Sequence, residues 1–249
     1  MNSLKYAAPL AQAILLVATT TAWGSLSYDQ NVNTPGPGVY YGTGNGNGAW
    51  TVDRENNIEL GLRGKVYGQG VYNSGGDGTY SFATGVSPLN LNRDTWNFDF
   101  SINVDANGTS GLHLSDFTFT LAVDSNPSLG QSFTDYNPLA IYNDDELALS
   151  GQAAPSVKVY NGNNSTLANY DVAQNSENAK FGLPLSYDPN IAGTYDFVLS
   201  AFDKTTGTLE AQTSMRILVG GGAVPEVETT CALLALGCAA LGGLRRFAR

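Results

Sequence analysis

Cysteine and histidine are almost absent from this chain of 249 residues. The two cysteines, Cys231 and Cys238, lie near the C-terminal end, and His113 is the only histidine. The central part of the chain therefore has no thiol, which excludes cysteine nucleophiles and cysteine-rich zinc sites there. A lone imidazole is more often a structural group than a base or a metal ligand. We assign no catalytic residue, no metal ligand and no cofactor.

Positive charge is also scarce. Residues 25–222 contain 8 Lys and Arg against 20 Asp and Glu, a net charge of −12. A surface that binds nucleic acid needs clustered basic side chains, which release counterions from the phosphates. Here the basic residues are scattered, and only Arg63 and Lys65 are close neighbours. The composition therefore excludes nucleic acid as an expected partner.

The C-terminal end has a distinctive order of residues. Val224, Pro225 and Glu226 come first, an uncharged run of 14 residues from Cys231 to Leu244 follows, and Arg245, Arg246 and Arg249 end the chain. This order resembles the PEP-CTERM sorting signal of Gram-negative bacteria, although Val227 stands where a second proline is usual. The resemblance implies a sorting signal over residues 223–249, with a membrane helix over 229–244 and a cytoplasmic basic end. It also implies processing by an exosortase.

The length of the uncharged run leaves a cleaved signal and a permanent membrane anchor open, and a buried amphipathic helix is a weaker alternative. At about 1.5 Å per residue, a helix of this length spans about 21 Å, less than the roughly 30 Å of a hydrocarbon core. Thr229, Thr230 and the stems of the arginines extend it to a marginal span. We expect a signal that is cut off, and a permanent membrane anchor is the alternative.

The N-terminal end predicts export. Lys5 precedes the uncharged and mostly apolar stretch 7–21, and small residues surround Trp23 at the expected cleavage site before Ser25. This is the pattern of a signal peptide over residues 1–24, removed by signal peptidase. The two ends together predict a chain held transiently in the inner membrane, with its arginines on the cytoplasmic side. Its destination is then the cell surface or the extracellular matrix.

Residues 25–222, the body of the chain, alternate with a period of two. The clearest strand runs from Trp96 to Val104, where the apolar residues Trp96, Phe98, Phe100, Ile102 and Val104 alternate with Asn97, Asp99, Ser101 and Asn103. Similar patterns predict strands over 57–67 and 117–123, and a hairpin of 195–201 and 209–219. Two prolines and six glycines mark 34–48 as a loop. Residues 161–180 are expected to form a long loop or to contain a short helix.

These strands predict an all-β domain, an antiparallel β-sandwich of the jelly-roll or immunoglobulin-like type. The signal helix and the membrane helix flank it. Segments 58–63, 77–82, 96–103 and 193–197 resemble parts of uncharacterised exported proteins that carry PEP-CTERM tails. That resemblance implies a common fold and association with exopolysaccharide, and it carries over no catalytic residue.

Acidic residues suggest two further hypotheses. Residues 143–146, and Asp99 with Asp105 and Asn107, offer oxygen ligands suited to calcium, although solvated acidic loops are the default interpretation. A glycosidase needs two apposed carboxylates, and Asp99 with Asp196 is one arbitrary pair among many. Neither pattern is specific enough to assign a site.

The sequence therefore predicts a non-catalytic envelope or matrix protein associated with exopolysaccharide. A carbohydrate-binding module on the same fold is the alternative, and a secreted glycan-active hydrolase is a weaker one. A binding module needs exposed rings, because sugar C–H faces pack on aromatic rings. The candidates lie in or near predicted loops: Tyr67, Tyr72, Tyr136, Tyr142, Tyr160 and Tyr170.

Overall fold

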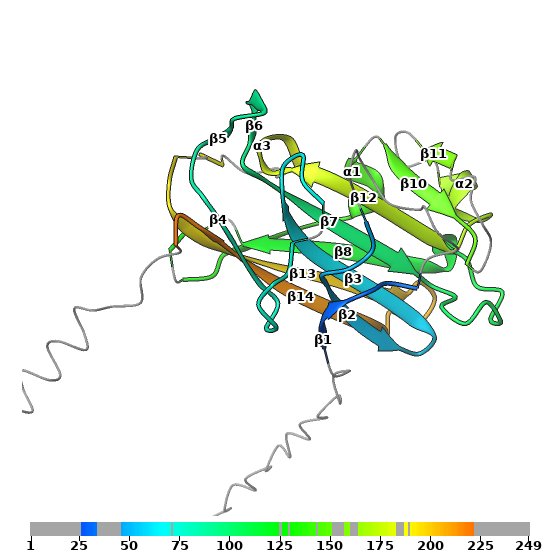
Figure 1. The fold of residues 1–249 in the computed structure, drawn as a ribbon. Coiled ribbons are helices and arrows are strands. Elements are labelled where there is room, and N and C mark those ends of the chain that lie inside the picture. Colours follow the sequence, from blue (N-terminus) through cyan, green and yellow to red (C-terminus); the bar gives the residue numbers. More distant parts are fainter. Residues whose placement is uncertain are drawn as a thin grey trace, which may run out of the picture.

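The computed structural model describes residues 26–33, 46–70, 72–124, 126–128, 130–142, 144–150, 157–159, 164–182, 187–188 and 190–221. In these residues two β-sheets pack face to face around one hydrophobic core (Figure 1). The prediction of an all-β sandwich is thereby confirmed. The predicted signal peptide 1–24, sorting signal 223–249 and membrane helix 229–244 lie outside the described residues. Within the described part of the chain, no helix has the length and apolar character needed to cross a membrane.

Sheet A has seven strands, all paired antiparallel with their neighbours. In spatial order they are β1 (Ser27–Gln30), β2 (Trp50–Glu55), β3 (Ile58–Val66), β7 (Trp96–Asn103), β12 (Val172–Asn178), β10 (Asp145–Ala148) and β11 (Val157–Val159). Strand β7 lies in the middle of this sheet, between β3 and β12. Sheet A therefore joins chain segments that lie far apart in the sequence.

Sheet B has five strands: β4 (Thr79–Phe82), β14 (Leu209–Val219), β13 (Gly193–Asp203), β8 (Phe117–Asp124) and β9 (Phe133–Tyr136). Its strands are antiparallel except for β4 and β14, which pair in parallel. The prediction of purely antiparallel pairing is therefore wrong at this edge. It fails because β4 reaches β14 through a long crossover and not through a hairpin, as parallel pairing requires.

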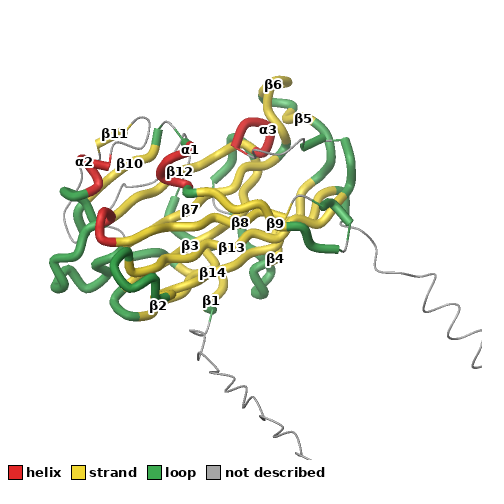
Figure 2. Tube along the Cα trace, turned by 180° about the vertical axis from the view of Figure 1, so that it is seen from behind, coloured by secondary structure: helices red, strands yellow, loops and turns green. Residues whose placement is uncertain are grey.

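A small two-stranded sheet and four short helical turns complete the described part of the chain (Figure 2). The small sheet is the hairpin of β5 (Val86–Ser87) and β6 (Asn90–Asp94), which projects from one end of the sandwich (Figure 1). The helical turns are η1 (Leu114–Asp116), α1 (Pro138–Ile141), α2 (Asn164–Leu167) and α3 (Ala179–Gly182).

The alternation in β7 places its apolar side chains in the core. Trp96, Phe98, Phe100, Ile102 and Val104 are all 0% exposed, as predicted. The ring of Phe98 lies 5.1 Å from that of Phe197 on β13, and the ring of Trp96 lies 5.7 Å from that of Phe82 on β4. These contacts join the two sheets. Glycine is required in the adjacent strand, because a Cβ at Gly64 would lie 2.7 Å from the Cδ1 atom of Ile217.

The opposite face of β7 carries Asn97, Asp99, Ser101 and Asn103, also as predicted. This face is not solvated, however, because all four residues are buried. Burial of polar groups is favourable only when they find hydrogen-bond partners or opposite charges. The partners of these residues define the region described below.

The prediction of a short helix within residues 161–180 is confirmed, but the prediction missed a strand. The segment contains α2 and also β12, a strand that pairs along its whole length with β7 and also with β10. Strand β12 has the sequence VAQNSEN, in which Gln, Asn, Ser and Glu interrupt any apolar alternation. Its position in the sheet is determined by the backbone ladder and by polar partners on both faces.

The hairpin of β13 and β14 agrees with its prediction. Residues 204–207 form the turn, and Gly207 has a positive φ of 72°. The Asp203 carboxylate accepts hydrogen bonds from the backbone N–H groups of Thr205 and Thr206, at 2.9 and 2.7 Å. An Asp side chain that binds the following N–H groups is a common way of closing such a turn.

Candidate ligand-binding groove on sheet A

The outer face of sheet A, which points away from sheet B, carries rows of polar side chains across β3, β7 and β12. The register places Lys65, Asn97 and Asn178 in one row and Arg63, Asp99 and Ser176 in the next. Further along, Ser101 lies beside Gln174, whose amide donates to the Ser101 Oγ atom at 2.9 Å. Strands contributed by three separate parts of the sequence thus build one polar surface.

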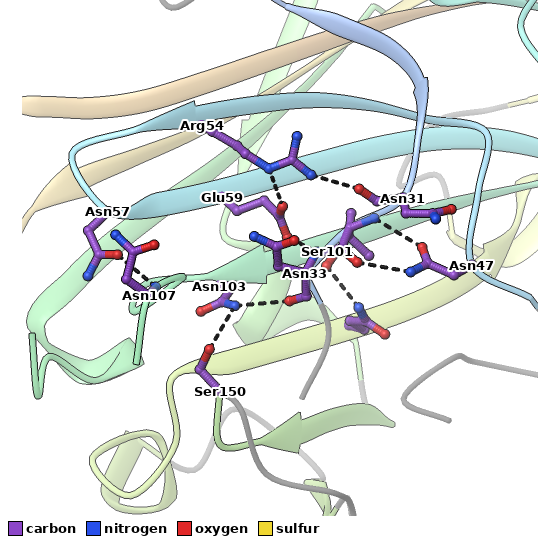
Figure 3. A network of polar contacts seen from close by, with 12 residues as sticks. Asn31, Asn33, Asn47, Arg54, Asn57, Glu59, Ser101, Asn103, Asn107 and Ser150 are labelled. Carbon is purple, nitrogen blue, oxygen red and sulfur yellow. Dashed lines mark hydrogen bonds and ion pairs between the residues drawn. The ribbon is translucent and has the colours of Figure 1, made fainter. Parts of the chain in front are cut away.

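At one end of this surface, the N-terminal segment covers the polar side chains (Figure 3). The backbone N–H of Asn33 donates to Glu59 Oε1 at 2.6 Å, and the Asn103 amide donates to the carbonyl of Asn33 at 3.1 Å. Arg54 donates to Glu59 Oε2 at 2.6 Å. Asn47 holds Val32 through hydrogen bonds in both directions. The N-terminal segment therefore covers this end of the surface, and the polar groups there stabilise the fold.

The centre of the surface is a buried ion cluster. Arg63 Nε donates to Asp99 Oδ2 at 2.7 Å, and Lys65 Nζ lies 3.6 Å from Asp99 Oδ1. The guanidinium group of Arg63 also donates to the carbonyls of Gly46 and Gly48 and lies 4.2 Å from the ring centroid of Trp50. Burial lowers the pKa of the Lys65 ammonium group, while the Asp99 charge opposes that shift.

Beyond the ion cluster the outer face opens into a groove with a volume of about 510 Å³. The groove is lined by Lys65, Tyr67, Gly68, Arg93, Asn97, Asp144, Ser176, Glu177, Asn178 and Phe181. Phe181 lies on α3 and is 59% exposed. The guanidinium group of Arg93 lies 4.4 Å from the centroid of the Phe181 ring, within the range of a cation–π contact. The groove thus combines an exposed ring with charged groups of both signs and with amides.

Two carboxyl groups, that of Glu177 at the groove and that of Asp145 beside it, titrate far from their usual range. Burial, followed by the negative charge of Asp144, raises the pKa of Glu177 to about 7. Burial also raises the pKa of Asp145 to about 8, although hydrogen bonding to Asn175 opposes the shift. The Asn175 amide donates to Asp144 Oδ1 at 3.1 Å and to Asp145 Oδ1 at 2.9 Å. Glu177 and Asp145 are therefore largely protonated in mildly acidic solution.

These raised pKa values predict a pH dependence of stability. Both carboxyls bind protons more tightly in the folded than in the unfolded chain, so the free energy of unfolding should fall as the pH rises from about 5 to about 8. Asp145→Asn should reduce that slope and make the protein more stable than wild type at the upper end of the range. Urea denaturation at a series of pH values measures the slope.

Asp203→Asn is the matched control, because hydrogen bonds from Thr206 lower the pKa of the Asp203 carboxyl. A group with a lowered pKa contributes a constant free energy above its unfolded pKa, so this variant should keep the wild-type slope. An unchanged slope in Asp145→Asn would contradict the assignment of the raised pKa.

The predicted candidate residues are dispersed over the structure. Of the loop tyrosines, Tyr67 lines the groove. Tyr72, Tyr136 and Tyr170 are partly buried against the core, and Tyr142 is buried with its ring 6.0 Å from that of Phe100. Tyr160 and the residues of the predicted sorting signal, Val224, Pro225, Glu226, Arg245, Arg246 and Arg249, lie outside the described residues. Most of the described tyrosines therefore cover the edges of the core.

The carboxylates of Asp99 and Asp196 lie too far apart to form a glycosidase site. Asp99 lies on the outer face of sheet A, whereas Asp196 lies on the outer face of sheet B, where it accepts two hydrogen bonds from Arg216 at 2.7 and 2.9 Å. Both layers of the sandwich separate them, so they cannot act on one glycosidic bond.

The two calcium hypotheses gain no support from the described residues. Although burial acts to raise the pKa of Asp105, hydrogen bonds from Ser110, Asn57 and Thr109 lower it to about 2. Asp99 is paired with Arg63 instead, and Asn143 lies outside the described residues. In the described ranges, no three His, Cys, Asp or Glu side chains are grouped so that they could hold a metal ion. His113 precedes η1, and its backbone N–H donates to Asp116 Oδ2 at 2.8 Å.

Most of the groove residues could not be predicted from the sequence. Phe181 belongs to a stretch without periodicity, and Arg93 counts as one of the scattered basic residues. The one available signal was the closeness of Arg63 and Lys65, two positions apart on one strand, which places both on the same face.

Comparisons with known proteins do not assign a family. No protein-family model matches the chain. No curated protein matches it either. Among solved structures, the N-terminal domain of PorA is similar over 65% of this chain and 99% of that chain, at 14% sequence identity and a TM-score of 0.20. A TM-score this low supports no conclusion about fold or function.

Proposed function

We propose that this protein is a non-catalytic exported protein that binds extracellular polysaccharide through the groove on sheet A. The observation that carries the proposal is the exposed ring of Phe181 beside Arg93 at the edge of a polar groove. The predicted export signals support an extracellular location for such a ligand. We further propose that the sandwich has jelly-roll or immunoglobulin-like topology.

The chemistry of the groove suits a sugar. The C–H face of a pyranose ring packs on an aromatic ring, and its hydroxyl groups bind amides, carboxylates and cations. Phe181 offers the ring, Asn97 and Ser176 offer polar groups, and Arg93 offers positive charge.

Phe181→Ala tests the proposal. Loss of the ring should weaken glycan binding about threefold to tenfold, which corresponds to roughly 0.5–1.5 kcal/mol for one stacking contact. Binding of the purified full-length chain to a glycan array, followed by calorimetry on the best ligand, measures the change. Leu112→Ala is the control, because Leu112 is an exposed apolar residue that does not line the groove. Equal affinities of the two variants would contradict the proposal.

A glycan-active hydrolase is the second candidate, and one observation favours it. Glu177 and Asp144 both contribute to the groove lining, although Glu177 lies on the same face of sheet A as Phe98, and the negative charge of Asp144 helps to raise the pKa of Glu177 to about 7. A carboxylic acid with a raised pKa near a second carboxyl group is the arrangement that glycosidases use. Turnover of a bound glycan that is abolished by Glu177→Gln would replace the binding function with this one.

The proposed destination makes a separate prediction about processing. If the C-terminal segment is a sorting signal, the mature protein should end near Val224, Pro225 and Glu226, and it should lack Cys231 and Cys238. Intact-mass analysis of protein isolated from the native envelope measures the end of the chain. A mature chain that still ends at Arg249 would instead mean a permanent anchor.

A further inference from the structure

Exposed apolar side chains gather at one end of the sandwich. Leu89 is 67% exposed and Leu91 is 73% exposed, and Val86 on the same β5–β6 hairpin is also exposed. Single exposed leucines are common on protein surfaces, whereas several together mark an interaction surface. We call Val86, Leu89 and Leu91 the hairpin patch.

The hairpin patch is not part of either large sheet. Strands β5 and β6 pair only with each other among the described strands, and they project beyond the sandwich (Figure 1). At the root of the hairpin lies an apolar groove of about 400 Å³, whose lining includes Val66, Tyr72, Phe82 and Leu89. A two-stranded hairpin is only marginally stable alone in water. A partner that covers its leucines would therefore stabilise it.

The chain leaves the sandwich at this same end. The N–H of Gly220 donates to the carbonyl of Phe82 at 2.8 Å, and a Cβ at Gly220 would lie 2.8 Å from Thr84 and 2.9 Å from Ala192. Thr84 is two residues before the hairpin patch, and Ala192 follows the exposed Ile191. The exit of the C-terminal segment and the hairpin patch are therefore close together.

The length of the chain after Gly221 limits the distance between this end of the sandwich and the apolar run 231–244. Residues 222–230 separate Gly221 from the uncharged run 231–244, and nine extended residues reach at most about 30 Å. The arginines follow that run. Whatever takes up the apolar run therefore lies within about 30 Å of the end that carries the hairpin patch.

Charges beside the patch suit an anionic surface. Arg93 lies on β6 and Lys180 on α3, which packs against β6. The carboxylates on this side are Asp94, which is buried, Asp188, which is exposed, and Asp144 and Glu177, which line the groove with Arg93. Basic side chains next to inserted leucines are typical of segments that bind the surface of anionic bilayers.

We propose that, before the C-terminal segment is cut, the β5–β6 hairpin lies on the surface of an anionic lipid bilayer, with Leu89 and Leu91 inserted among the headgroups. The inference rests on membrane insertion of residues 231–244, which belongs to the proposed function. Insertion of the tail and insertion of the hairpin give different readouts, so the failure of one can be told from the failure of the other.

The test uses residues 25–249, the chain without its predicted signal peptide, with Cys231→Ser and Cys238→Ser, incorporated into vesicles of phosphatidylethanolamine and phosphatidylglycerol. A bimane label is placed at Leu91→Cys in one sample and at Thr206→Cys in a control. Thr206 is exposed and lies in the turn before β14, at the opposite end of that strand from Gly220. Flotation reports insertion of the tail, and quenching by lipids with brominated acyl chains reports depth at each label.

We expect both samples to float, with quenching of the label at position 91 and none at position 206. Adding Leu89→Asn to the Leu91→Cys chain should shift the emission of its label to longer wavelength and reduce the quenching. Flotation with equal quenching at the two positions overturns the hairpin contact alone. A blue-shifted label at position 91 without quenching overturns it in favour of a protein partner or a second copy. Chains that do not float overturn both the inserted tail and the hairpin contact.

Discussion

Phe100→Asp is expected to prevent folding. Phe100 is fully buried at the centre of β7, between the strands β3 and β12 of sheet A, and its ring packs on Tyr142. An unpaired carboxylate at that position costs several kcal/mol, against a total stability of about 5–15 kcal/mol for a domain of this kind. Far-UV circular dichroism and thermal unfolding of the purified variant should show no cooperative transition.

Phe133→Asp is the matched control for this experiment. Phe133 lies on β9 at the edge of sheet B, and its side chain is 42% exposed. The same substitution there removes little buried apolar surface, so the midpoint of unfolding should stay close to that of the wild type. Similar transitions for the two variants would mean that β7 does not form the core.

Asp99→Asn is the substitution with the second largest expected effect. The variant keeps the size of the side chain but removes the charge that faces Arg63 and Lys65, both of which are buried. Removing one partner of a buried ion pair leaves an uncompensated charge and typically costs about 3–5 kcal/mol. The loss should appear as a lower midpoint of urea denaturation. Adding Lys65→Met should recover part of it, because one of the two unpaired cations is then removed.

A similar pair on the other sheet provides the control. Asp196 also accepts a hydrogen bond from an arginine at 2.7 Å, but half of the Arg216 side chain is exposed to solvent. Solvent screens such a pair, so Asp196→Asn should cost about 1 kcal/mol or less. Comparable losses for the two substitutions would show that burial does not determine the strength of the Asp99 cluster.

The contrast between β7 and β12 shows what the sequence could predict. In β7 the alternation of aromatic and polar residues predicted both the strand and the face that enters the core. Strand β12 pairs with β7 over seven positions, yet Asn175 and Glu177 lie on the same face as Phe100 and Phe98. In β12, polar residues therefore occupy positions where the alternation would place apolar ones, so the pattern does not reveal the strand. Neighbours such as Asp145 stabilise these polar residues.

The groove could not be predicted either, because it depends on β12, the strand that the sequence pattern did not reveal. Lys65, Asn97 and Asn178 form one row only because β12 lies beside β7, and local sequence contains no information about that pairing. Phe181 reaches the groove because α3 follows β12 directly. Period-two patterns identify strands one at a time, whereas a binding surface depends on which strands become neighbours.

The parallel pairing of β4 with β14 has a consequence for the order in which the chain can fold. Strand β14 lies between β4 and β13, and its residue Thr213 donates to the carbonyl of Thr51 on sheet A. Until residues 209–219 are available, sheet B lacks one of its central strands, and the inner faces of both sheets stay incompletely covered. Contacts of such long sequence separation also form slowly. In an exported chain, this late closure would keep the body unfolded until nearly all of it has crossed the membrane.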